Sequence, residues 1–182
     1  HAADVLHYAL GYEESGPVEC IHPGSNAFPT LTCKYANGEL LHLVRGWDEV
    51  KSLYGAVPDT AVLDGNFGGV VVGERGWLTT MSGGSGVTGG PEELMAEYNA
   101  WEHDVALGDK DHHGNWFECI RTRNKPHSHE GIGHRAASLG HLTIITYKLG
   151  RSLKWDPVNE IFPEDEQANR LLRRARRAPW SI

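Results

Sequence analysis

Histidine and carboxylate side chains at short spacing are the first candidates for chemistry in this 182-residue sequence. His1 and Asp4 stand three residues apart, which makes them neighbours on one face of a helix. A histidine beside a carboxylate can act as a general acid or base, because the carboxylate holds the imidazole in one tautomer. The same pair is also typical of an ordinary helix surface, so the spacing alone leaves both interpretations open.

Other histidines occur in small groups in the second half of the chain. The groups are Glu102-His103-Asp104, Asp111-His112-His113 and His127-Ser128-His129. They could line a sugar-sized cleft, because imidazole and carboxylate groups hydrogen-bond to hydroxyls. They could also bind zinc or iron. No pair has a diagnostic spacing such as H-E-x-x-H, and His134 and His141 share a helix face without reaching one metal ion.

A glycine-rich segment at 84–89 fits the G-x-G-x-x-G pattern of dinucleotide-binding loops. The strand before it is typical of half a hairpin, and no parallel strand follows the next helix. Two neighbouring glycines add flexibility. We therefore expect a mobile loop at this segment rather than a cofactor site.

The first half of the chain is predicted to contain one helix and several strands. Apolar spacing predicts an opening helix that stops at Gly11. A strand then precedes Pro23-Gly24. One hairpin turns at Asn37-Gly38, whose backbones tolerate positive φ, and a second turns at Glu74-Arg75-Gly76.

Helical periodicity dominates the second half. The predicted helices span 91–104, 111–125, 131–150 and 163–177. Asp111 is the expected N-cap of the second, with Trp116, Phe117 and Ile120 facing inward. One helix, several strands and then helices predict an α+β fold with a mainly antiparallel sheet.

Composition excludes several classes of function. The net charge of −7 argues against nucleic acid as the main partner, because phosphate binding needs clustered positive charge. No apolar stretch approaches the length that spans a bilayer. Cys20, Cys33 and Cys119 lack metal-ligand spacing and are expected to be small buried residues. They do not fix the compartment; a cytoplasmic location is favoured over a periplasmic one.

The last third of the chain carries a dense set of motifs. In order they are N-[WF]-x-x-C-[IV]-R-[ST]-R-x-x-P at 115–126, G-H-R-[AS]-[AS] opening 133–138, L-G-R-x-L-x-W-D-P at 149–157 and R-A-P-W-[ST]-[IL] at 177–182. This set resembles the C-terminal end of the glucose–fructose oxidoreductase / inositol dehydrogenase / rhizopine-catabolism (Gfo/Idh/MocA) family.

The start of the chain extends the resemblance. The residues 1–4 are similar to the second half of the family's D-x-x-x-H-x-x-D pattern, and 16–19 to the "GPVEV"-like residues after its helix. The resemblance implies that His1 is the catalytic histidine. It also implies that Asp4 contacts the substrate or orients the histidine.

Later residues receive weaker assignments from the same resemblance. His112 and His113 lie in a D-H-H-x-N segment that could face the substrate cleft. Trp47, Trp101 and Trp116 could stack on sugar faces, although core packing is the commoner role of tryptophan.

The resemblance also implies a domain organisation. Family members bind NAD or NADP on an N-terminal Rossmann domain with a catalytic lysine in an E-K-P motif, which this sequence lacks. Residues 1–182 are then expected to form a single substrate-binding and oligomerisation domain. Its implied fold is an open, mostly antiparallel sheet with helices on one face, like the C-terminal domain of dihydrodipicolinate reductase. The implied partners are a sugar or cyclitol substrate and a second copy on the free sheet face.

Two other functions stay open at the level of sequence. The chain could be a stand-alone binding or assembly domain without chemistry. It could also be a metal-dependent carbohydrate-active enzyme built on the histidine groups. No motif in the sequence names the sugar or chooses between NAD and NADP.

Overall fold

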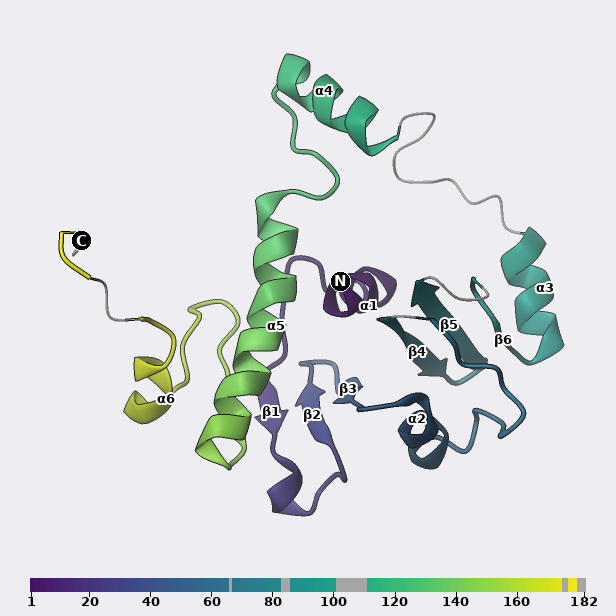
Figure 1. The fold of residues 1–182 in the computed structure, drawn as a ribbon, viewed down its shortest axis with the longest axis horizontal. Helices are drawn as coiled ribbons and strands as arrows, with labels where there is room; N and C mark the ends of the chain where they lie inside the picture. The colour runs from purple at the N-terminus through teal and green to yellow at the C-terminus, as the bar shows by residue number, and fades with distance from the viewer. Residues whose placement is uncertain (66, 83–85, 101–110, 175–176, 180–182) are drawn as a thin grey trace. The chain divides into compact units, whose positions relative to one another are not determined.

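The computed structural model describes residues 1–65, 67–82, 86–100, 111–174 and 177–179 (Figure 1). The chain begins with a helix, continues mainly with strands and ends mainly with helices, as predicted. The α+β class is confirmed. The chain divides into two compact units. Unit 1 comprises His1–Glu14 and Arg45–Ala136, and unit 2 comprises Ser15–Val44 and Ala137–Ile182. No helix in the described part is long and apolar enough to cross a membrane.

Unit 1 combines a short helix with a three-stranded sheet. Helix α1 (Ala2–Leu10) ends at Gly11, whose φ of 72° is the left-handed conformation predicted for its cap. Strands β4 (Phe67–Gly73) and β5 (Gly76–Ser82) form the predicted antiparallel hairpin. Strand β6 (Gly89–Gly90) pairs antiparallel with β5 and completes the order β4-β5-β6.

Three more helices belong to unit 1. They are α2 (Trp47–Leu53), α3 (Glu92–Ala100) and α4 (His112–Thr122). Periodicity did not predict α2, which is only seven residues long; Asp48 and Glu49 in its first turn complement the helix dipole. Helix α3 lies against β6, and Arg75 at the hairpin turn donates to Glu97 of α3 at 2.6 Å.

Unit 2 is built on a four-stranded antiparallel sheet of order β3-β2-β1-β7. The strands are β1 (Glu19–Ile21), β2 (Leu31–Lys34), β3 (Leu40–Leu43) and β7 (Leu153–Lys154). The predicted hairpin at Asn37-Gly38 joins β2 to β3, and Gly38 has a φ of 94°. The core contains Cys20, Leu31, Cys33, Tyr35, Leu142, Ile145 and Phe162.

Two helices from the motif-rich last third of the chain contribute to unit 2. Helix α5 (Glu130–Leu149) is the long helix predicted to end at Gly150, and its part in unit 2 buries Leu139, Leu142 and Ile145. Helix α6 (Glu166–Arg170) is shorter than predicted. It stops because Leu171 and Leu172 donate to carbonyls three residues back, which closes the last turn as a 3₁₀-type turn.

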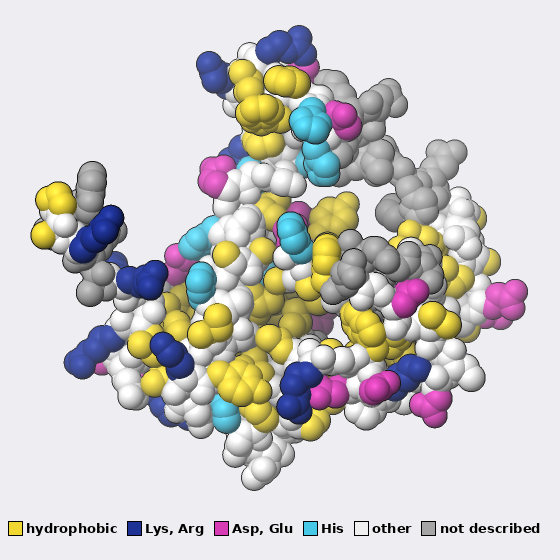
Figure 2. All heavy atoms as spheres, in the orientation of Figure 1, with side chains coloured by type: hydrophobic (Ala, Val, Ile, Leu, Met, Phe, Trp, Pro, Cys, Tyr) yellow, Lys and Arg dark blue, Asp and Glu magenta, His cyan; other side chains and the backbone are white. Residues whose placement is uncertain are grey.

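Two features differ from the sequence predictions. The strands form two sheets instead of one, because the segment between β3 and β4 contains α2 and no described strand. The inward orientation predicted for three residues of α4 is wrong, since Trp116, Phe117 and Ile120 are 55%, 58% and 45% exposed. Figure 2 shows hydrophobic side chains gathered on the surface of α4. Only Cys119 of this helix is buried, so the described residues leave its apolar face uncovered.

Candidate functional site

The first candidate site lies on α1, where His1 and Asp4 share the first turn. His1 is the N-cap residue, and its carbonyl accepts from the amide of Val5 at 3.0 Å. The His1 imidazole is exposed, and Asp4 is half-buried one turn later. A carboxylate in the first turn is favoured by the helix dipole, and here it stands one turn from an accessible imidazole.

Strand β4 holds α1 in place beneath this pair. The ring of His1 stacks on Phe67, the first residue of β4, with centroids 5.4 Å apart and an interplanar angle of 28°. Leu6 on the inner face of α1 lies directly over Gly69, where an added Cβ would meet Leu6 Cδ2 at 2.6 Å. Glycine at 69 therefore lets the helix approach the strand closely, and this approach brings His1 onto Phe67.

His7 is a third titratable residue of this helix face. It is 1% exposed and stands three residues after Asp4. Burial lowers the pKa of His7 below its usual range, because it disfavours the charged imidazolium, and the charge of Asp4 opposes this shift. His7 is therefore a neutral imidazole at pH 7 that shares the electrostatic field of Asp4.

Helix α4 presents the second predicted pair, His112 and His113. Asp111 is the N-cap as predicted, since its carboxylate accepts from the amide of Gly114 at 2.7 Å. Both histidines are exposed in the first turn, and Nδ1 of His113 lies 3.9 Å from the Asp111 carboxylate. Asn115 of the same helix accepts from the amide of His127 at 3.1 Å, so it holds the loop that follows α4.

The structure brings together some of the predicted residues and not others. His1 and Asp4 share one turn of α1, and His112 and His113 share one turn of α4. The two pairs lie on different helices of unit 1. The sequence analysis missed His7 and Phe67. The three-residue step from Asp4 to His7 could have indicated the first, whereas nothing in the sequence pairs Phe67 with His1.

The histidine groups do not form a metal site in the described part of the chain. There, no three or more His, Cys, Asp or Glu side chains are arranged to hold an ion. The group Glu102-His103-Asp104 lies outside the described residues.

The described part of the glycine-rich segment is packed into a sheet. Its last residue, Gly89, lies in β6, which pairs with β5, and helix α3 begins only after this strand, at Glu92. The buried Thr79 hydroxyl accepts from the amide of Thr88 at 2.8 Å, and the amide of Thr79 donates to the Thr88 carbonyl at 2.8 Å. Gly84 and Ser85 lie outside the described residues.

The tryptophans named for sugar stacking are in different settings. Trp116 is 55% exposed and lies beside Phe117, with ring centroids 5.3 Å apart. Trp47 is half-buried at the start of α2, and Trp101 lies outside the described residues. Of the two described tryptophans, Trp116 is the more exposed, as stacking on a sugar requires.

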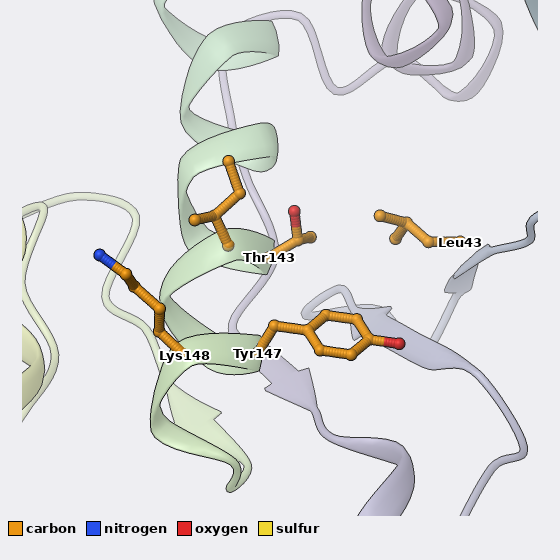
Figure 3. A pocket seen from close by; sticks show the side chains of 5 residues that line it. Leu43, Thr143, Tyr147 and Lys148 are labelled. Atoms are coloured by element: carbon orange, nitrogen blue, oxygen red, sulfur yellow. The ribbon is translucent and has the colours of Figure 1, made fainter.

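A hollow of about 430 Å³ lies on unit 2, and none of the predicted site residues lines it. Leu43, Thr143, Ile144, Tyr147 and Lys148 line it. Figure 3 shows the Tyr147 ring and Thr143 directed toward Leu43, whereas Lys148 points away. The Thr143 hydroxyl already donates to the Gly140 carbonyl at 2.8 Å, so the hollow is an open apolar surface with few polar groups that could orient a ligand.

Comparison with known proteins gives one finding. Residues 98–182 match the family model described as "Oxidoreductase family, C-terminal alpha/beta domain" of the Gfo/Idh/MocA oxidoreductases. The matched part is somewhat less than half of the chain; it includes His112 and His113 and leaves out His1 and Asp4. Searches of the curated proteins and of the solved structures give no significant match.

Proposed function

We propose that this chain, whose residues 98–182 belong to the C-terminal domain of Gfo/Idh/MocA oxidoreductases, is the substrate-binding and oligomerisation domain of a sugar dehydrogenase. The reaction is the NAD- or NADP-dependent oxidation of a secondary hydroxyl in a sugar, glycoside or cyclitol. The match to the family's C-terminal domain is the observation that carries this proposal.

In the proposed reaction, His1 accepts the proton of the substrate hydroxyl. Its imidazole is exposed, and stacking on Phe67 limits the orientations that the ring can adopt. Asp4, three residues away, stabilises the imidazolium that forms and can accept a hydrogen bond from a second hydroxyl. In this proposal α1 therefore carries the acid–base chemistry.

His112 and His113 are proposed to bind substrate hydroxyls. Both are exposed at the start of α4, and a neutral imidazole offers one donor and one acceptor. A polyhydroxylated ring presents the matching groups. The Trp116 ring on the same helix offers an apolar face of the kind that stacks on sugars.

The described part of the glycine-rich segment runs into strand β6, so we do not assign the nicotinamide cofactor to it. We therefore assign NAD or NADP to a Rossmann domain outside these 182 residues, as the family resemblance implies. The role left to this chain is to bind the substrate and to receive the hydroxyl proton.

Substrate binding by the chain itself is the first test. The chain is titrated with myo-inositol, glucose and methyl glucoside while the NMR signals of the histidine rings are monitored. We expect the ring signals of His1, His112 and His113 to shift. The variant His1→Ala should weaken binding, whereas His141→Ala, an exposed histidine of α5 in unit 2, should not. A chain that binds no polyol, or that loses binding equally in both variants, contradicts the proposal.

Turnover is the second test. Joined to a cofactor domain that carries G-x-G-x-x-[GA] and E-K-P, the chain should form reduced nicotinamide with a polyol. His1→Ala should lower the turnover number about 10²-fold to 10⁴-fold, the usual contribution of a general base. An undiminished turnover number in His1→Ala would remove the catalytic assignment and leave the binding assignment standing.

A further inference from the structure

Two cysteines face each other at the centre of the sheet in unit 2. Cys20 of β1 and Cys33 of β2 are direct cross-strand partners, and their Sγ atoms are 3.6 Å apart. Both side chains are 0% exposed, and both are free thiols. The sequence predicts only that both are small buried residues, so their pairing is a property that the tertiary structure reveals.

The antiparallel register already supplies most of the geometry of a disulfide. Directly opposite residues have Cβ atoms about 4.5–5.5 Å apart, close to the range of about 3.5–4.5 Å in disulfides. The sulfur atoms must approach by about 1.5 Å, from 3.6 Å to about 2.05 Å. Rotation about the two Cα–Cβ bonds with a small movement of the strands can achieve this.

We propose that Cys20 and Cys33 form a redox-responsive dithiol, which a peroxide converts into a disulfide that links β1 to β2. This modification site is independent of the proposed oxidoreductase function, because neither cysteine lies on α1 or α4. It would also not depend on the nicotinamide cofactor.

The chemistry balances with one peroxide as oxidant. One cysteine, as thiolate, attacks a peroxide oxygen; the O–O bond breaks, and a sulfenic acid and, after protonation, one water form. The second thiol then attacks the sulfenic sulfur, the S–S bond forms and the second water leaves. Two thiols lose two electrons in total, and hydrogen peroxide is reduced to two waters.

The surroundings of the pair make this reaction slow. The hydrogen bond with Cys20, together with burial, raises the pKa of the Cys33 thiol well above its usual value, which suppresses the reactive thiolate. Both strands are internal in the order β3-β2-β1-β7, so the peroxide reaches the thiols only when the sheet opens locally. The same burial protects the disulfide from thiol reductants once it has formed.

Peptide mapping of the oxidised chain tests the proposal. Because Lys34 is the first lysine or arginine in the sequence, trypsin releases both cysteines in one peptide, 1–34, and Cys119 in another, 111–121. The folded full chain is treated with hydrogen peroxide, then denatured and alkylated. Peptide 1–34 is expected to carry no alkyl group and to be lighter by two hydrogen atoms than the reduced peptide, and dithiothreitol should restore two alkylation sites.

Variants separate the pair from ordinary thiol oxidation. Cys20→Ala and Cys33→Ala should each abolish the peroxide-dependent disulfide, whereas Cys119→Ala should leave it intact. Oxidised wild type should also unfold at a higher temperature than the reduced chain, because the link constrains the unfolded state. Both this measurement and the peptide map use the wild-type chain, so they do not depend on whether the variants fold.

Three results would overturn the proposal. Peptide 1–34 could stay fully alkylated at peroxide doses that oxidise Cys119. Sulfinic or sulfonic acids could form on Cys20 and Cys33 in place of the disulfide. The disulfide could also form only in the urea-unfolded chain, which would show that the folded sheet does not present the thiols to each other.

Discussion

At the scale of single residues, Gly69 decides how closely α1 approaches β4. Gly69→Ala would place a Cβ 2.6 Å from Leu6 Cδ2 and 2.9 Å from Leu6 Cδ1. We expect this variant to lower the free energy of unfolding by about 1–3 kcal/mol, the usual cost of overpacking, and to loosen the stacking of His1 on Phe67. Chemical denaturation measures the first effect, and the ring signals of His1 report the second.

Gly133 provides the matched control for Gly69. It lies in the part of α5 that belongs to unit 1, and an added Cβ would meet no atom within 4 Å. Gly133→Ala should therefore raise the free energy of unfolding by up to about 1 kcal/mol through helix propensity. Equal losses in the two variants would show that Leu6 does not press on Gly69.

His7 makes the stability of unit 1 dependent on pH. Its pKa in the folded chain is below the ordinary value of 6.5 because of burial, so the unfolded chain binds more protons between these two values. The contribution of His7 to the free energy of unfolding is fully present above pH 6.5. It is lost as the pH falls through the pKa of His7 in the folded chain. Denaturation at pH 7.5 and 5.5 should show this loss in wild type and a smaller loss in His7→Gln.

The exposed His113 is the control for this prediction, since His113→Gln should keep the wild-type loss. Half-buried His42 in unit 2, whose pKa is also lowered by burial, contributes to the part that His7→Gln retains. A pH dependence that His7→Gln leaves unchanged would mean that His7 is not buried as the structure shows.

At the scale of elements, Asp111 holds the first turn of α4, which carries His112 and His113. Asp111→Ala removes the acceptor of the Gly114 amide and should destabilise the helix by about 1 kcal/mol. Asp111→Asn should preserve it, because asparagine is an equally good N-cap. Hydrogen exchange of the α4 amides measures both variants. Equally fast exchange in the two would show that the cap does not hold this turn.

At the scale of the whole molecule, the open question is whether the chain associates with copies of itself. The prediction that it forms homo-oligomers through a free sheet face is still a proposal. Ile144 and Tyr147 of unit 2 are exposed apolar side chains, but they lie on helix α5 and not on a sheet face. Sedimentation velocity over a range of concentrations should show a dimer or larger species. A monomer at every concentration would contradict oligomerisation of this chain.

The sequence by itself determined several local elements, although not α2. Gly11, Asn37-Gly38 and Asp111 each act within a few residues, through left-handed conformations and an N-cap, and the structure confirms all three. The motifs from Asn115 onward also indicated the oxidoreductase family, and residues 98–182 match the model of that family's C-terminal domain. Local backbone chemistry and dense motifs can be read without knowing distant contacts.

Only the tertiary structure decided which residues meet across long stretches of chain. It pairs His1 with Phe67, places Leu6 over Gly69 and sets Cys20 against Cys33. It also shows that the apolar residues of α4 are exposed, whereas periodicity predicts that they face inward. Periodicity identifies an apolar face but not what covers it, because burial and cross-strand register depend on partners far away in the sequence.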